Sequence, residues 1–369
     1  MRAQPAIQAL RVYDPGHDLV ALRRAAAPRT LVELGSNENP YGPSPRVRIA
    51  IDAVLSQLHR YPDPRGGDLK RALAQRNGVD VEQIVLGNGS HELLMQLAQV
   101  FAGPDCDVLV PQYGFAVFAI AAAAVGARAV VVPALPATHA MPRGHDLDAM
   151  RAAITPATRL LYLANPNNPT GTWIADGAFA AFIAQLPRDV LVVVDEAYAE
   201  IADAPDHASA LRHLGAYPNL VVTRTFSKAY ALAGLRIGYA IGSKDVIALL
   251  ERVRESFNLG VVALAAAQAA LADDAYLRDT VARTIVQRER LANELRGRGW
   301  TVSPSQANFL LVEFGARTAD IESALRARDV VLRPMGGYGL PECLRISVGD
   351  DDEQRRLLAA LDAIVETGS

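Results

Sequence analysis

Short apolar runs alternate with helical patterns from about residue 84 to about residue 257, and this alternation constrains the fold more than any other feature. The runs LVVVD (191–195) and LVVT (220–223) are continuously apolar, as expected for strands that are covered on both faces of a sheet. Strands that alternate with helices form mostly parallel sheets with right-handed crossovers. We therefore predict an α/β fold whose seven-stranded sheet is sandwiched by helices, the other strands beginning near residues 84, 107, 127, 158 and 237.

The pattern changes after about residue 257, where long helical stretches rich in Ala, Leu and Arg fill residues 263–299. They are followed by the strand-like NFLLVEF (308–314), a helical pattern near 318–328 and the strand-like CLRISVG (343–349). This order predicts a second, smaller α+β domain. We expect a large domain over residues 46–260, and a small domain made of residues 1–45 and 261–369.

Charge and cysteine content exclude several classes of protein. The net charge of −3 and the pI near 6.2 argue against bulk binding of nucleic acid. Cys106 and Cys343 match no metal-ligand or CxxC spacing, so we expect no metal site and a reduced, cytoplasmic setting. The longest apolar stretch is broken by Gly126 and Arg128, and the first residues contain no apolar core of signal-peptide length. No membrane span is expected.

Polar clusters follow several of the predicted strands, at the edge where open α/β sheets bind their ligands. The first strand ends in Gly87-Asn88-Gly89-Ser90 directly before a helix. A glycine turn at a helix N-terminus presents free backbone N–H groups to a phosphate, although many strand–helix turns have this form. The run lacks the GxGxxG spacing of a dinucleotide site.

Two later strands also end in polar residues. Residues 165–171 (NPNNPTG) form a proline-flanked loop that presents side-chain amides, or simply a proline-rich turn. Asp195 follows LVVV at the rim of the buried sheet, where an unpaired charge is costly. Its cationic partner is either a protonated ring nitrogen of a ligand or an arginine in a structural salt bridge.

Lys228 is one of only three lysines among 37 basic residues, and it lies in the small-residue segment TFSKAYALAG. Arginine keeps its proton in proteins, whereas a desolvated lysine can lose its proton and attack a carbonyl. A phosphate turn, a carboxylate at a strand end and such a lysine are the set that pyridoxal phosphate needs. The alternative is that Lys228 has no special function and is a lysine by chance in an arginine-rich chain.

With these motifs the chain resembles the fold-type I pyridoxal-phosphate aminotransferases of the aspartate aminotransferase superfamily, and within them the histidinol-phosphate aminotransferases. The resemblance runs nearly end to end and in family order, through SNENPYGPSP, HRYPDP, LGNGS, ANPNNPTGT, VVVDEAY, RTFSKAYALAGLRIGYAIG and RPMGGYGLPECLRISVG. It implies an enzyme that converts histidinol phosphate and 2-oxoglutarate to imidazole-acetol phosphate and glutamate. It also implies a homodimer.

The resemblance assigns a role to each motif residue. Lys228 would form the Schiff base with the cofactor and then act as general base and acid. Asp195 would keep the pyridine nitrogen protonated, while Asn168 and Tyr198 would hydrogen-bond the ring 3-oxygen. Tyr113 would stack on the ring. The phosphate would be held by Ser90, His91, Ser227 and Arg236, with Thr225 as a weaker candidate and Tyr61 reaching across from the neighbouring subunit.

For the substrates, the resemblance implies that Arg345 binds the carboxylate of glutamate. Arg333 and Tyr13 would hold the substrate phosphate, and Asn37 in SNENPYGPSP would also face the substrate. One departure stands out, because His91 occupies a position where this subfamily often carries an acidic residue or an asparagine. Three other functions stay open: an aromatic amino-acid aminotransferase, a threonine-phosphate decarboxylase, and a non-enzymatic regulatory domain of the same fold.

Overall fold

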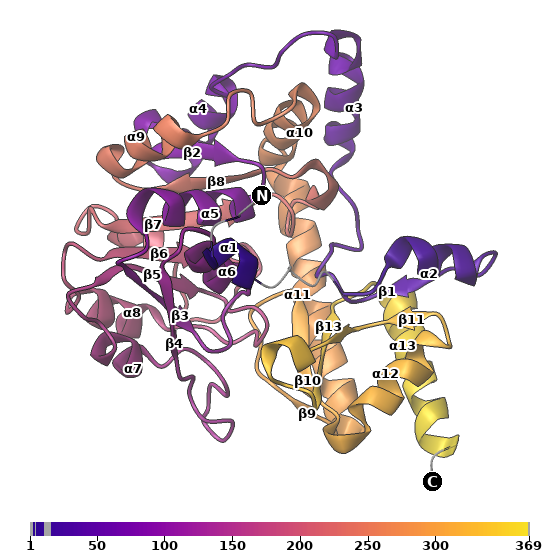
Figure 1. The fold of residues 1–369 in the computed structure, drawn as a ribbon. Coiled ribbons are helices and arrows are strands. Elements are labelled where there is room, and N and C mark those ends of the chain that lie inside the picture. The colour runs from indigo at the N-terminus through magenta and orange to yellow at the C-terminus, as the bar shows by residue number, and fades with distance from the viewer. Residues whose placement is uncertain (1–2, 4, 11–15, 368–369) are drawn as a thin grey trace.

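The structure of the protein is a computed structural model that describes residues 3, 5–10 and 16–367 (Figure 1). Its central feature is a seven-stranded sheet of order β2-β8-β7-β6-β5-β3-β4, in which β8 runs antiparallel to the other six strands. The predicted α/β fold with a mostly parallel sheet is confirmed. The strands are β2 (Ile84–Gly87), β3 (Asp107–Pro111), β4 (Arg128–Val132), β5 (Thr158–Ala164), β6 (Leu191–Asp195), β7 (Leu220–Thr225) and β8 (Gly238–Ile241).

Helices cover both faces of this sheet, which explains why its strands are apolar on both sides. In β5, Leu160 and Tyr162 pack toward one face, whereas Leu161 and Leu163 pack toward the other. The first face is covered by α5 (Ser90–Phe101), α6 (Val117–Ala124) and α9 (Lys244–Val253). The second face carries α7 (Leu147–Ala152) and α8 (Asp176–Ile183).

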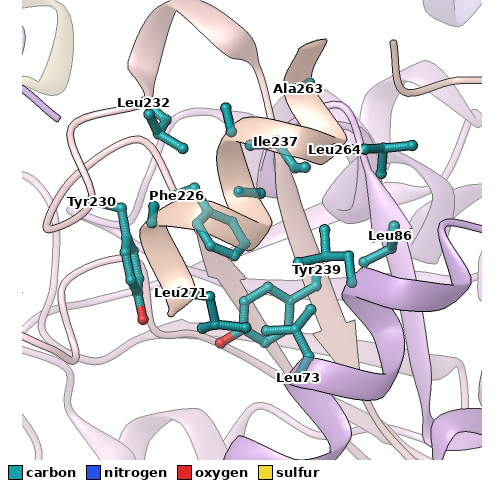
Figure 2. Close-up of a cluster of buried hydrophobic side chains, with 14 of the residues drawn as sticks. Leu73, Leu86, Phe226, Tyr230, Leu232, Ile237, Tyr239, Ala263, Leu264 and Leu271 are labelled. Atoms are coloured by element: carbon teal, nitrogen blue, oxygen red, sulfur yellow. The ribbon is translucent and has the colours of Figure 1, made fainter. Parts of the chain in front are cut away.

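A further cluster packs over β2 and β8, against α3 (Pro45–Val54), α4 (Gly67–Asn77) and α10 (Val261–Leu271). Figure 2 shows Tyr239 of β8 among Leu73 of α4 and Leu264 and Leu271 of α10. The domain boundary expected after residue 260 places α10 in the small domain, yet the buried side chains of α10 belong to this cluster. We propose that the boundary lies between α10 and α11 (Asp274–Gly297).

The C-terminal part forms a four-stranded antiparallel sheet of order β12-β13-β10-β9. Leu291 and Leu295, near the end of α11, belong to its core, and Figure 1 shows α11 running between the two sheets. The N-terminal segment joins this part through a parallel pair between β1 and β11. The elements are β1 (Val32–Glu33), β9 (Thr301–Val302), β10 (Phe309–Glu313), α12 (Thr318–Arg326), β11 (Val330–Val331), β12 (Arg333–Pro334), β13 (Cys343–Ser347) and α13 (Asp351–Thr367).

The remaining described elements are short or peripheral: α1 (Pro5–Ala9), α2 (Leu19–Ala26) and 3₁₀ helices at 55–57, 81–83, 210–213, 233–235, 315–317 and 336–338. Within residues 3, 5–10 and 16–367, no helix has both the length and the apolar character that crossing a membrane requires. Because β2, β5, β6 and β7 all run in the same direction, their carboxyl ends lie at one edge of the large sheet. The polar clusters predicted from the sequence all lie at this edge.

Candidate active site

A cavity of about 450 Å³ opens at the carboxyl edge of the large sheet and reaches the small domain. Its volume is in the range typical of small-molecule sites. Most of the residues predicted from the sequence line it, although they come from segments far apart in the chain: Asn37, Ser90, His91, Asn168, Asp195, Tyr198, Thr225, Ser227, Lys228, Arg236, Arg333 and Arg345.

Lys228 lies three residues beyond the end of β7, and its side chain reaches into the cavity. Its Nζ donates hydrogen bonds to the carbonyl oxygens of Ser36 (3.2 Å) and Asn37 (3.1 Å). Burial, together with the nearby Arg345 guanidinium, lowers the pKa of the Lys228 amine to about 7. At neutral pH a substantial fraction of this amine is therefore unprotonated and able to act as a nucleophile or a base.

Asp195 ends β6 and is only 5% exposed. Its carboxylate accepts a hydrogen bond from the Thr223 hydroxyl at 2.9 Å, but burial raises its pKa to about 7. The arginine that lies near this strand end, Arg224, instead pairs with Glu196 at 2.7 Å. A carboxyl group in this position is well suited to a cationic group of a ligand, because such a group would stabilise the ionised form.

An anion site lies where β2 ends and α5 begins. Gly89 has φ of +79° and precedes Ser90, the first residue of α5, so the helix N-terminus faces the cavity. Gly238 of β8 is required beside it, because a Cβ there would lie 2.6 Å from the Ser90 backbone nitrogen. From the other side, Arg236 Nη1 donates to Ser227 Oγ at 3.2 Å. Backbone N–H groups, a hydroxyl and a guanidinium thus surround one small volume.

Ser227 is also held by the end of β7. The Thr225 hydroxyl donates to Ser227 Oγ at 2.9 Å and accepts from the Ser227 backbone N–H at 3.0 Å. Both side chains are buried, so Thr225 fixes the direction of the Ser227 hydroxyl. This geometry gives Thr225 a supporting position behind the anion site.

The opposite wall of the cavity joins the large domain to the small domain. The Tyr198 hydroxyl accepts a hydrogen bond from Asn37 Nδ2 at 3.0 Å, and burial raises the pKa of Tyr198 to about 12. Arg345 of β13 donates from Nη1 to Asn168 Oδ1 at 2.5 Å. Arg333 of β12 is the direct cross-strand partner of Arg345. Two guanidinium groups from neighbouring strands therefore face the same cavity.

Two of the predicted site residues that the structure describes do not line the cavity. Tyr113 is half-buried and packs against the cluster of Leu311, Met335, Leu340 and Cys343, as Tyr338 does. Tyr61 is 83% exposed and stacks on Phe257 with 4.6 Å between the ring centroids. Tyr13 lies outside the described residues.

The cavity also contains side chains that the sequence reasoning did not single out. Glu38, Phe115 and Tyr338 line it. Glu38 and Tyr338 lie within motifs quoted from the sequence, and Phe115 lies two residues after Tyr113, so proximity in the chain was the available signal. Within the described part of the chain, no group of three or more His, Cys, Asp or Glu side chains is arranged to hold a metal ion.

Comparison with known proteins identifies the family to which this site belongs. The family described as "Aminotransferase class I and II" matches residues 29–361. Histidinol-phosphate aminotransferase 2 of Methylococcus capsulatus is 44% identical over 98% of this chain and 98% of the relative. Histidinol-phosphate aminotransferase 2 of Pseudomonas aeruginosa is also 44% identical, over 98% of this chain and 97% of the relative.

A solved structure shows the same fold. The crystal structure of histidinol-phosphate aminotransferase from Sinorhizobium meliloti, in complex with pyridoxal-5'-phosphate, superposes with a TM-score of 0.89 and 33% identity. The superposition covers 100% of this chain and 98% of that one. The present chain belongs to the class I and II aminotransferases and, within them, to the family of histidinol-phosphate aminotransferases.

Proposed function

We propose that the protein is a pyridoxal-phosphate-dependent aminotransferase that transfers the amino group of histidinol phosphate to 2-oxoglutarate, forming imidazole-acetol phosphate and glutamate. The observation that carries this proposal is Lys228, whose desolvated amine lies in one cavity with a buried carboxyl group and an anion site. The relatives and the superposed structure support the same activity and cofactor. The cytoplasmic setting expected from the cysteines stays a prediction.

The residues of the cavity fit pyridoxal phosphate. Burial raises the pKa of Asp195, and a protonated pyridine nitrogen beside it would stabilise its ionised form. The N-terminus of α5, Ser227 and Arg236 form an anion site whose donors suit a phosphate group. When bound, the cofactor supplies an electron sink for the substrate carbanion.

Each side chain in the cavity would then have its own role. The Lys228 amine would hold the cofactor through its aldehyde group, with loss of water, and its Nζ would also accept and donate the proton that amino transfer requires. Asp195 would hold the proton on the ring nitrogen, and Asn168 and Tyr198 would donate to the ring 3-oxygen. The phosphate would be held by Ser90, His91, Thr225, Ser227 and Arg236.

The two paired arginines would bind different anionic groups of the substrates. Arg345 is buried and hydrogen-bonded to Asn168 and the Gly35 carbonyl, which fixes its guanidinium for the substrate carboxylate. Arg333 lies beside it, packed so closely on Gly16 that a Cβ there would lie 2.0 Å from Arg333 Nη1. This contact brings Gly16 of the N-terminal segment next to Arg333. We propose that Arg333 binds the phosphate of histidinol phosphate.

Replacing Arg333 by alanine should raise the KM for histidinol phosphate by about 30-fold or more, because a lost charge-assisted contact to a buried anion costs about 2–5 kcal/mol. The KM for phenylalanine should change by less than about threefold, since phenylalanine has no phosphate. Steady-state kinetics with both amino donors provides the test. The exposed Arg328→Ala serves as the control, and Arg345→Ala should impair the glutamate half-reaction as well. Equal losses on both donors for Arg333→Ala would remove its phosphate role.

We also propose that two copies of the chain form the active dimer, with Tyr61 completing the site of the neighbour. Exposed apolar side chains are frequent in the same segment, where Ile49 is 70% and Leu58 is 60% exposed. Apolar side chains gathered on one surface are typical of an interface between proteins. Tyr61 itself is more exposed than either of them.

Tyr61→Phe should weaken retention of the cofactor without disturbing the fold of the protomer, because only the hydroxyl that reaches the phosphate is lost. Neither this variant nor Lys228→Ala should be fully active alone. Mixing the two should restore one complete site per heterodimer, in which Lys228 of one protomer meets Tyr61 of the other. Activity is measured after subunit exchange, with each variant mixed with itself as the control. If mixing restores nothing, the site is not shared.

A further inference from the structure

His91 is the second residue of α5 and lies between two cavities. It lines the main cavity with Ser90, and it lines a neighbouring cavity of about 340 Å³ with Asn88, Glu92 and Arg236. The imidazole is half-buried, with its ring perpendicular to that of Phe115 at a centroid distance of 6.4 Å. The His91 ring thus lies beside the N-terminus of α5 and the Arg236 guanidinium, which together form the anion site.

The charges around His91 disfavour its protonated form as long as no anion is bound. Burial lowers the pKa of His91, and the positive charge of Arg236 lowers it further. The N-terminus of its own helix adds a positive partial charge. Glu92 shares the smaller cavity, and the charged side chains that share the main one are Glu38, Asp195, Lys228, Arg236, Arg333 and Arg345.

We propose that His91 makes the affinity of the site for a phosphate dianion depend on pH, because its imidazole takes up a proton from solvent when the dianion binds beside Ser90, Ser227 and Arg236. The proposal rests on the proposed function, since it takes this dianion to be the phosphate of the cofactor. Asparagine, the replacement used in the test, gains no charge between pH 6 and pH 8.5.

The sign of the effect follows from linkage between the two equilibria. A bound dianion favours the protonated imidazole, so the pKa of His91 is higher in the complex than in the free chain. Affinity is then greatest below the lowered pKa of the free chain. It decreases as pH rises toward the pKa of the complex and becomes constant above it. An opposite charge a few ångströms away changes a pKa enough for an effect of about tenfold or more.

Pyridoxamine 5'-phosphate is the suitable probe, because it has an amine in place of the aldehyde and cannot bond covalently to Lys228. Its Kd is measured by titration calorimetry on the full-length chain and on His91→Asn, from pH 6 to pH 8.5. Titration of the phosphate group itself is common to both proteins and cancels in the ratio of their Kd values. Repeating the titration in buffers of different ionisation enthalpy gives the number of protons taken up. The exposed His139→Asn is the matched control.

We expect the Kd of His91→Asn divided by the Kd of the unmodified chain to fall roughly tenfold or more between pH 6 and pH 8.5. The extra proton uptake on binding should be absent in the variant. His139→Asn should behave as the unmodified chain does. Tight binding with the same pH slope in the chain and in His91→Asn would overturn the proposal and leave the proposed function intact. Failure of the unmodified chain to bind the probe at any pH would instead contradict the proposed function. If His91→Asn does not fold, as judged by circular dichroism, His91→Gln gives the same comparison.

Discussion

Lys228→Arg is expected to lose about 10⁴-fold or more in kcat while the chain keeps its fold, because proton transfer and nucleophilic attack both require an amine that can lose its proton. Arginine keeps the positive charge but stays protonated at every pH at which the protein is folded. The loss should therefore be chemical. The lowered pKa of Lys228 is the physical basis of this prediction, since burial and Arg345 both favour the neutral amine.

Two measurements check this prediction. The first is the turnover of Lys228→Arg beside that of Lys244→Arg, whose lysine is exposed and paired with Asp80 and Glu82. The control should keep normal turnover. The second is borohydride reduction of the cofactor-loaded protein, followed by peptide mass analysis, which should place the cofactor on Lys228. Near-normal turnover of Lys228→Arg, or a label on another lysine, would contradict the assignment.

Asp195→Ala is expected to reduce kcat by about a hundredfold or more. The buried carboxylate and a protonated ring nitrogen would form an ion pair in a partly desolvated site, worth a few kcal/mol, and each 1.36 kcal/mol corresponds to about tenfold in rate. Without the carboxylate, the ring nitrogen loses its proton and the cofactor becomes a weaker electron sink. The raised pKa of Asp195 in the structure should also fall when the cationic nitrogen binds.

The measurement is kcat for Asp195→Ala, with Asp189→Asn as the matched control. Asp189 is exposed and lies just before the amino end of β6, the strand that Asp195 ends. A general weakening of this strand would affect both variants, whereas loss of the ring partner affects only Asp195→Ala. A decrease of less than tenfold in kcat would reduce Asp195 to a structural role.

The sheet could be predicted because its strands are buried on both faces and therefore read as unbroken apolar runs. The direction of β8 could not, since an apolar run such as GYAI carries no information about whether its neighbours are parallel. Nor does the sequence pattern decide to which domain α10 belongs. Ala263, Ala266 and Ala267 show that α10 is apolar, but only tertiary packing decides which domain it covers.

The site residues could be predicted where polar or ionisable side chains lie at the end of a strand. Ser90, Asp195 and Ser227 follow strands that share one edge, so the topology brings them together. Arg333 and Arg345 required the resemblance, because nothing in a single sequence shows that β12 pairs with β13. The packing of Tyr113 against Met335 and Leu340 could not be predicted, since the direction of this loop side chain depends on contacts with the distant C-terminal part of the chain.

The most direct test of the account is kcat/KM for histidinol phosphate, phenylalanine and tyrosine as amino donors, each with 2-oxoglutarate and with glutamate and carbon dioxide measured as products. We predict that histidinol phosphate has the highest kcat/KM, with one glutamate formed per donor consumed and no carbon dioxide. A higher kcat/KM for phenylalanine or tyrosine would contradict the account in favour of an aromatic amino-acid aminotransferase. Carbon dioxide released from threonine phosphate without glutamate formation would contradict it in favour of a decarboxylase.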